Sequence, residues 1–266
     1  MSLVDSEDPE DILSDGGLET LYDLKPITLA SAGSLFVYDL AEAKVTLRTP
    51  NTQAANWSLH ASSVWAASRF LADNLDYLDL PAHLGRGGSV KLLELGAAAG
   101  LPSIVIARRY PAVSVVVSDY PDEELIRTLT ENVDKNVVSA NCRAVAYGWG
   151  SDPSELFLPN GEKFDVVAAS DCLWNPEFHG LFIEALQLTL KASPHSRIHL
   201  FAGLHTGRYT IQAFLTAVSA AGFDLETAVE REMNGVRQRS WSVDRAEGED
   251  ESERRRWIVY LCLRWR

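Results

Sequence analysis

A run of small residues in the middle of the chain is where chemistry is first expected. Residues Leu92–Pro102 read LLELGAAAGLP, an apolar segment that leads into a turn of glycine and alanine and then into a helix signal at Pro102. Small side chains allow a ligand to approach the backbone closely. In an open α/β sheet, ligands bind beyond the carboxyl ends of the strands, so this turn predicts a ligand-binding cleft.

What the turn lacks narrows the choice of ligand. A dinucleotide fingerprint needs glycine at its first, third and sixth positions, where this chain has Gly96, Ala98 and Leu101. No GxxxxGKS or GxxxxGKT loop for a nucleoside triphosphate is present either. Asp119 follows the next apolar strand, where a carboxylate accepts hydrogen bonds from both hydroxyls of an adenosine ribose. Recognition of ribose without phosphate suggests S-adenosylmethionine.

Strands alternate with helices on both sides of the turn. Strands are expected at Val90–Leu95, Val113–Ser118, Arg143–Ala146, Phe164–Ala169 and Arg197–Ala202, and helices at Val64–Leu75, Pro102–Arg109, Phe178–Leu190 and Tyr209–Ala221. Such alternation predicts an α/β fold with a mostly parallel sheet and helices on both faces. Trp65 is expected on the buried side of the first helix.

Two hairpins are expected outside this alternation. Leu35–Leu40 and Val45–Leu47 predict a small hairpin ahead of the main domain, and Asp224–Glu230 and Trp257–Leu263 predict one that closes the sheet. Residues 244–256, here called the charged block, join the second pair of strands. We expect them to form a solvated loop.

Four short motifs, taken together, resemble those of a known group of enzymes. In chain order they are residues 94–102 (ELGAAAGLP), 118–122 (SDYPD), 147–150 (YGWG) and 169–175 (ASDCLWN). They are similar to the seven-strand class I methyltransferases and, within these, to the lysine-methyltransferase-like branch. The similarity is greatest to the fungal protein N-terminal and lysine N-methyltransferase 7 family, which acts on translation elongation factor 1-alpha. It extends from about Leu35 to the C-terminus and implies a seven-strand, Rossmann-like sheet.

The resemblance also implies roles for individual residues. The implied cofactor-binding residues are Trp65, Glu94, Gly96, Ala97, Ala98, Asp119, Trp149 and Ser170. Asp119 would hold the ribose, Trp149 would lie along the adenine ring, and Ser170 and Glu94 would lie near the methionine end. Many relatives have glycine where this chain has Ala98, whose methyl group narrows the pocket. From the pattern alone, core or rim packing is the more common role for the two tryptophans, and a turn or helix cap for an aspartate such as Asp119.

The reaction itself demands little beyond positioning. Methyl transfer from a sulfonium is an in-line displacement, so the protein must orient an amine and remove its proton. We expect Asp171 to orient the amine, with Tyr120 and Trp174 shaping a slot; a purely structural capping role for Asp171 is the alternative. An α-amino group titrates near pKa ~7.7–8.0 and lysine near ~10.4, so a protein N-terminus is the easier substrate.

Composition limits the partners and the compartment. With 24 basic and 37 acidic residues the net charge is −13, which disfavours nucleic acid and favours a basic protein substrate. No apolar run is long enough for a membrane span, and the first twenty residues carry seven acids and no Lys or Arg, unlike a signal peptide. Three widely spaced cysteines predict a reduced, cytoplasmic protein. No metal is expected, since His195 and His199 do not share a helix face.

The sequence thus predicts one domain with an extension. Residues 1–30 are expected to form an acidic, flexible segment that covers the cofactor or guides a basic substrate, and residues 31–266 the methyltransferase domain. The expected function is a monomeric S-adenosylmethionine-dependent protein N-methyltransferase, releasing S-adenosylhomocysteine, that acts on the N-terminal amine and an adjacent lysine of elongation factor 1-alpha. Two alternatives stay open: a small-molecule, nicotinamide-type N-methyltransferase, and a non-catalytic binding module on the same fold.

Overall fold

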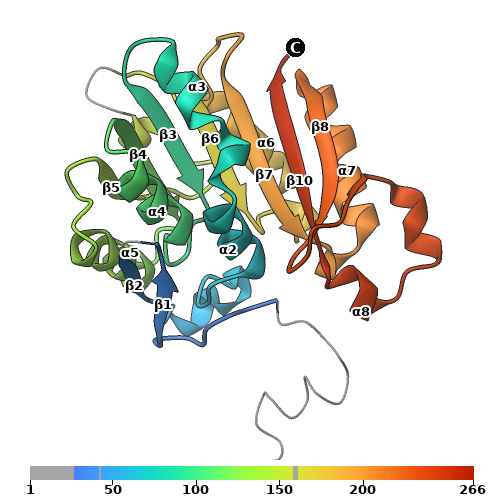
Figure 1. Cartoon of the computed structure of the whole chain (residues 1–266), viewed down its shortest axis with the longest axis horizontal. Helices are drawn as coiled ribbons and strands as arrows, with labels where there is room; N and C mark the ends of the chain where they lie inside the picture. The colour runs from blue at the N-terminus through green and yellow to red at the C-terminus, as the bar shows by residue number, and fades with distance from the viewer. Residues whose placement is uncertain (1–26, 42, 158–160) are drawn as a thin grey trace, which may run out of the picture.

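A computed structural model describes residues 27–41, 43–157 and 161–266 (Figure 1). A sheet of eight strands runs through the middle of the molecule, with helices on both sides. The strands are β3 (Val90–Leu95), β4 (Val113–Asp119), β5 (Cys142–Ala146), β6 (Val166–Ser170), β7 (Arg197–Gly203), β8 (Phe223–Glu232), β9 (Gln238–Ser240) and β10 (Trp257–Trp265). The expected α/β class is confirmed.

The order of the strands locates the ligand-binding edge. It is β5-β4-β3-β6-β7-β10-β8-β9, so the chain moves outward from β3 in one direction and then crosses to β6 to move outward in the other. Strands β3 to β7 pair in parallel, whereas β10 is antiparallel to both of its neighbours. Seven of these strands correspond to those expected. β9 was not expected, because three residues are too few to carry a period.

Helices cover the two faces of the sheet. They are α2 (Ala66–Asp73), α3 (Leu80–Gly85), α4 (Leu101–Arg109), α5 (Glu123–Lys135), α6 (His179–Thr189), α7 (Arg208–Ala220) and α8 (Glu251–Arg254), with 3-10 turns η2 (Ala54–Leu59), η3 (Leu75–Leu78), η4 (Ser154–Leu156), η5 (Pro176–Phe178), η6 (Leu204–Thr206) and η7 (Val243–Glu247). Successive residues of β3 serve opposite faces: Leu92 packs in the core with α2, α4 and α5, and Leu93 in the core with α6 and α7. None of these helices is long and apolar enough to cross a membrane in the described part of the chain.

The expected N-terminal hairpin is confirmed as β1 (Leu35–Asp39) and β2 (Lys44–Arg48), paired antiparallel. Two asparagines one turn apart on α5 attach it to the domain. The Asn132 carboxamide accepts from the Arg48 backbone N–H at 2.8 Å and donates to the Arg48 carbonyl at 2.8 Å, and Asn136 does the same with Thr46 at 3.1 and 3.0 Å. These two side chains thus pair with backbone groups of β2 in the way that a neighbouring strand would.

The start of α2 differs from expectation. The helix begins at Ala66, and Trp65 is its half-buried N-cap residue rather than part of its buried side. Residues 27 and 28 hold the start of α2 in place. Thr28 forms a short antiparallel bridge with Trp65, and the Ile27 carbonyl accepts from the Ala66 N–H at 2.9 Å. Residues 27–30 are therefore paired with the main domain, and the expectation for residues 1–26 lies outside the described residues.

The closing hairpin is confirmed by the antiparallel pairing of β8 with β10. The charged block between them is exposed or half-buried along its length, but the Glu249 side chain turns inward. Arg208, at the start of α7, is fully buried and pairs bidentately with Glu230 of β8 at 2.6 and 2.9 Å. It also bonds Glu249 from the charged block at 2.7 Å, and Arg239 and Arg245 complete the network. The expected solvated segment is thus correct for most of the block and wrong for Glu249, because sequence alone does not show which charge of a block faces inward.

Candidate active site

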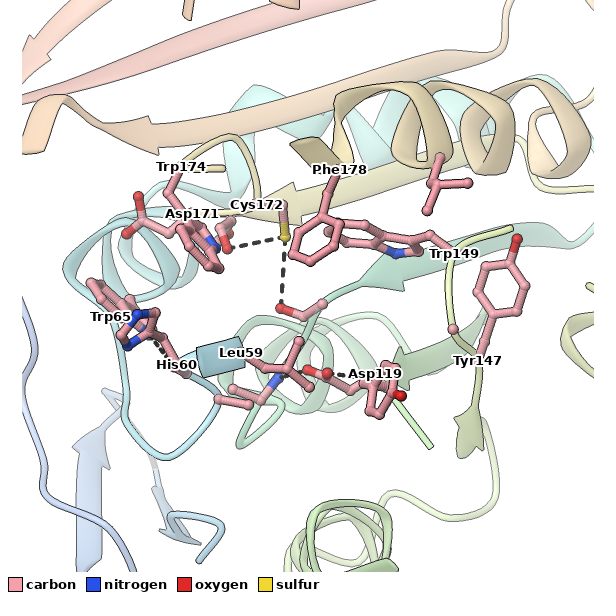
Figure 2. Close-up of a pocket in the computed structure, with 17 residues that line it drawn as sticks. Leu59, His60, Trp65, Asp119, Tyr147, Trp149, Asp171, Cys172, Trp174 and Phe178 are labelled. Carbon is pink, nitrogen blue, oxygen red and sulfur yellow. Dashed lines mark hydrogen bonds between the residues drawn. The ribbon is translucent and has the colours of Figure 1, made fainter. Parts of the chain in front are cut away.

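A cavity lies at the carboxyl ends of β3, β4 and β6, at the crossing point of the sheet (Figure 2). It contains about 940 Å³ of space not filled by protein atoms, its open mouth included. Aromatic side chains form much of its wall, among them Trp65, Trp149 and Trp174. The polar groups are few and come from strand ends, which is the usual composition of a small-molecule site.

The turn after β3 forms one side of the cavity. Gly96 has a φ of 68°, and a Cβ there would lie 2.5 Å from the Cys172 sulfur, so no other residue fits without movement. Ala98 also adopts a left-handed backbone, with φ of 49°, a conformation that strains an L side chain. Both residues line the cavity, while Ala97 lies beneath them in the core and lines an adjoining small recess.

Asp119, at the end of β4, is fixed by the turn. Its Oδ2 accepts from the Ala98 backbone N–H at 2.6 Å and its Oδ1 from the Tyr120 N–H at 2.6 Å. Burial raises the pKa of this carboxyl to about 6, against the opposing effect of the two N–H donors. Each carboxylate oxygen has a second lone pair, so Asp119 keeps the capacity to accept two hydroxyl groups of a ribose.

Glu94 lies behind the turn. Its side chain is buried, and its Oε2 accepts from the Ser103 backbone N–H at 3.0 Å and from the Ser103 hydroxyl at the start of α4. Burial raises the pKa of Glu94 to about 7. The side chain lines the small recess next to the main cavity, so it approaches a ligand from behind the turn rather than across the open space.

Ser170, the last residue of β6, provides a test of whether the cofactor fits. Its hydroxyl is buried and has no hydrogen-bond partner within the described residues, and the residue lines both the cavity and the recess. Buried hydroxyls are rarely left unpaired, so this one indicates that a ligand group completes it. S-adenosylmethionine has an uncharged ribose, an aromatic adenine and a polar amino-acid end. The cavity offers a carboxyl, an aromatic wall and an unpaired hydroxyl, so its residues fit that cofactor.

The opposite wall is aromatic. Trp149, in the loop after β5, is half-buried and packs on Phe182 of α6 with ring centroids 4.6 Å apart. Figure 2 shows its indole beside Phe178 at the edge of the cavity. An indole face exposed to an apolar slot is suited to stacking with a purine ring.

Asp171 lies across the cavity from Asp119 (Figure 2). Its φ of 54° is strained for a non-glycine residue, and its carboxylate accepts from the backbone N–H groups of Gly203, at 2.6 Å, and of Ala67. Burial raises the pKa of Asp171, and the nearby His205 lowers it. The carboxylate is therefore held in one position beside the cavity.

The other two expected catalytic residues lie at different places on the wall. Trp174 follows Asp171 in the loop after β6 and meets the His60 ring edge-on, 5.1 Å between centroids. Tyr120 follows Asp119 and is 42% exposed at the mouth. All three line one cavity, but Tyr120 belongs to the side that carries Asp119.

Several cavity residues were missed in the sequence. His60 occupies a left-handed position after η2, and Cys172 lies under the Gly96 turn. Phe178 was assigned to the start of a helix, and its position in η5 directs it to the cavity instead. His205 stacks on Trp65 from outside the cavity. Of these four residues, only Cys172 lies within one of the four sequence motifs. The sequence offered no signal that the other three belong near a site.

The sheet crosses over between β3 and β6, has an antiparallel strand next to its last parallel one, and carries a buried carboxyl at the end of β4. Together these features are those of a class I methyltransferase. The family model described as lysine methyltransferase matches residues 47–220. The chain belongs to this lysine methyltransferase family and is an S-adenosylmethionine-dependent N-methyltransferase.

Two curated proteins and one solved structure show the similarity of this chain to known proteins. The chain is 33% identical over 181 residues to "Protein N-terminal and lysine N-methyltransferase efm7" of Schizosaccharomyces pombe, covering 65% of this chain and 68% of that protein. It is 30% identical over 191 residues to the protein of the same name from Gibberella zeae, covering 65% and 70%. Among solved structures, a methyltransferase from Pyrococcus furiosus is 16% identical with a TM-score of 0.48, covering 75% of this chain and 82% of that one.

Proposed function

We propose that this protein methylates the N-terminal amine and an adjacent lysine of a basic protein, and that this substrate is translation elongation factor 1-alpha. The observation that carries the proposal is the single cavity with Asp119 on one side and Asp171 on the other (Figure 2). The first carboxylate is suited to a ribose, the second to an amine. The names of the relatives, protein N-terminal and lysine N-methyltransferase, support the same class of substrate.

On the cofactor side, the residues bind rather than react. Asp119 would accept the ribose hydroxyls, Trp149 would stack on the adenine, and Ser170 and Glu94 would hold the polar methionine end. When bound, the cofactor supplies an electrophilic methyl group. Its enclosure by apolar walls excludes water from that group.

On the substrate side, Asp171 would accept a hydrogen bond from the incoming amine and orient its lone pair. Trp174 narrows the approach beside it. An α-amino group is partly neutral at neutral pH, with pKa ~7.7–8.0, so it needs less help to lose its proton than lysine does. This difference favours the amino terminus as the first acceptor.

The net charge of −13 supports a basic protein partner. We propose a monomer in the cytoplasm; the three cysteines are unpaired and buried, which suits a reducing compartment. We also propose that the acidic residues ahead of Ile27 guide the substrate, and deletion of residues 2–26 tests this by comparing KM for a basic peptide.

The test of the proposed function is a labelling experiment. The purified protein is incubated with labelled S-adenosylmethionine and cytosolic extract, and labelled bands are identified by mass spectrometry. We expect label in elongation factor 1-alpha at its amino terminus, lost in Asp171→Asn and Asp119→Ala and kept in the exposed-site control His195→Gln. Label in small molecules alone would support a nicotinamide-type enzyme, and cofactor binding without any transfer would support a binding module.

A further inference from the structure

A short segment ahead of α2 forms part of the cavity mouth. Residues 53–61, here called the strap, contain η2 and carry His60, whose exposed side chain lines the cavity (Figure 2). The residues on either side of the strap are joined by a hydrogen bond of 2.9 Å between the Thr52 and Ser62 hydroxyls. The strap is thus a closed loop, and a contact with its middle decides where His60 lies.

Asp122 supplies that contact. It is the buried N-cap residue of α5, three residues after Asp119. Its Oδ1 accepts from the Leu125 backbone N–H at 3.0 Å, which caps the helix. Its Oδ2 accepts from two groups of the strap, the Gln53 backbone N–H at 3.1 Å and the Asn56 Nδ2 at 2.7 Å. One carboxylate oxygen therefore caps the helix while the other holds the strap.

The strap brings the His60 ring between two aromatic walls of the cavity. His60 ends η2 with a left-handed φ of 54°, which turns the chain at this point. Its ring meets Trp65 edge-on with centroids 6.2 Å apart and Trp174 edge-on with centroids 5.1 Å apart. The Trp65 indole N–H also donates to the His60 carbonyl at 2.9 Å. The three rings adjoin at the end of the cavity where Figure 2 shows Asp171.

We propose that Asp122 is a positioning residue, which holds the strap so that the His60 ring forms a wall against which the acceptor peptide packs. This rests on the proposed function, in which Asp171 orients the amine of that peptide. A fixed ring at the mouth covers apolar parts of the peptide and limits the directions from which its amine enters. Asp122 lies outside the cavity wall, and no bond forms or breaks at its carboxylate.

Hydrogen exchange follows the strap without turnover. Asp122→Ser keeps a side chain suited to capping α5 but removes the carboxylate oxygen that the strap uses. With S-adenosylhomocysteine bound, backbone amides of residues 53–61 should exchange about tenfold faster in this variant, because bonds to a charged group are lost. Amides of α5 should exchange as in the wild-type protein. Asp134→Ser, the same change at an exposed acid of α5, should alter neither segment.

Peptide kinetics show whether Asp122 acts through His60. His60→Asn removes the ring and leaves a residue that tolerates the left-handed backbone. We expect KM for a basic N-terminal peptide to rise about fivefold in Asp122→Ser and in His60→Asn, with kcat and affinity for S-adenosylhomocysteine nearly unchanged. The double variant should show no larger KM than His60→Asn alone, because the ring that Asp122 positions is already gone.

Each outcome decides between this role and simple helix capping. Unchanged exchange of the strap in Asp122→Ser would overturn the proposal, as would a KM increase in the double variant equal to the product of the two single increases. If Asp122→Ser does not fold, Asn56→Ala replaces it, since that change removes a strap bond and leaves the α5 cap in place. Absence of any peptide methylation by the wild-type protein would count against the proposed function instead; binding of the peptide to the protein with S-adenosylhomocysteine would then replace KM in the same comparison.

Discussion

Ala98 occupies a backbone conformation that normally belongs to glycine, with φ of 49°. Left-handed geometry costs an L residue roughly 1–2 kcal/mol. Replacement by glycine removes that cost, but it destabilises the folded protein by roughly 0.4–1 kcal/mol because the unfolded chain becomes freer. Ala98→Gly should therefore be neutral to stabilising by up to about 1.5 kcal/mol.

The matched control is Ala99→Gly, one residue later at a position where φ is not positive. It should destabilise by roughly 1–2 kcal/mol, because the freer unfolded chain is joined by the loss of a buried methyl group. Urea unfolding of both variants measures the difference. A loss of stability in Ala98→Gly equal to that in Ala99→Gly would show that position 98 is unstrained.

The raised pKa values of Asp119 and Glu94 predict how cofactor affinity depends on pH. Both groups would accept hydrogen bonds from the cofactor as carboxylates. Their pKa values are about 6 for Asp119 and about 7 for Glu94. At a pH below its pKa, each group must lose a proton before the cofactor binds. Affinity for S-adenosylhomocysteine should be constant above pH 8, weaken below about pH 7 and fall more steeply below about pH 6, by up to tenfold per group and pH unit.

Calorimetry between pH 5 and 8.5 measures this profile. Asp119→Asn should weaken binding at neutral pH and remove the steeper part of the decline, while the Glu94 part remains. A flat profile in the wild-type protein would mean that neither carboxyl changes its protonation on binding.

At the residue level, the sequence predicted the cavity residues that lie at strand ends or within recognisable motifs. Asp119 and Asp171 could be placed at the ligand-binding edge because each follows a strand with a recognisable apolar run. Trp149 and Ser170 were identified through the family resemblance, and they line the same cavity. His60 and His205 could not be placed in the same way. Their positions depend on η2 and η6, turns of a few residues without a period.

At the scale of elements, α5 anchors the N-terminal hairpin through side chains that imitate a strand. The Asn132 carboxamide also donates to the Ala99 carbonyl at 3.0 Å, so it links the hairpin to the turn that forms the cavity. Asn132→Leu would leave the buried Ala99 carbonyl unpaired, at roughly 1–3 kcal/mol, and the two part-buried backbone groups of Arg48, at less than that each.

We expect Asn132→Leu to lower the free energy of unfolding by about 2–4 kcal/mol, since more than one group is lost. The exposed Asn51→Leu is the control and should change stability by less than about 0.5 kcal/mol. Chemical denaturation measures both. Equal values for the two variants would show that the hairpin is not held through Asn132.

A second prediction about how elements are held together concerns the buried ion network around Arg208. Removing Arg208 leaves two buried carboxylates, Glu230 and Glu249, without their main partner. Breaking a buried pair in this way costs about 3–5 kcal/mol. Arg208→Met should show that loss in urea unfolding, whereas Arg127→Met, at an exposed pair on α5, should be indistinguishable from wild type.

Most elements could be predicted because buried strands and amphipathic helices have distinct periods. β3 has the expected bounds, and β4 and α4 agree within a residue at each end. α5 was not assigned, although its buried face recurs at Leu125, Leu129 and Val133. Glu249 of the charged block was missed for another reason: its inward position depends on pairing with Arg208, which is distant in the sequence.

At the scale of the whole molecule, the net charge of −13 predicts a salt effect on association. Attraction between this protein and a basic peptide is screened beyond about 8 Å at physiological ionic strength. The association rate should fall severalfold between 0.02 and 0.2 M salt, roughly, with little change in dissociation. Stopped-flow measurement with basic and neutral peptides tests this; an equal salt dependence for the two would contradict it.

The position of β10 between β7 and β8 has a consequence for how the protein is made. Ribosomes deliver β8 before the strand that joins it to the rest of the sheet (Figure 1). Until Trp257–Trp265 has left the exit tunnel, the apolar edge of β7 has no neighbour and β8 has nothing to pair with. An unpaired strand edge invites association with other nascent chains. Pairing of β10 is thus also the step that covers the edges of β7 and β8 and protects them from association with other chains.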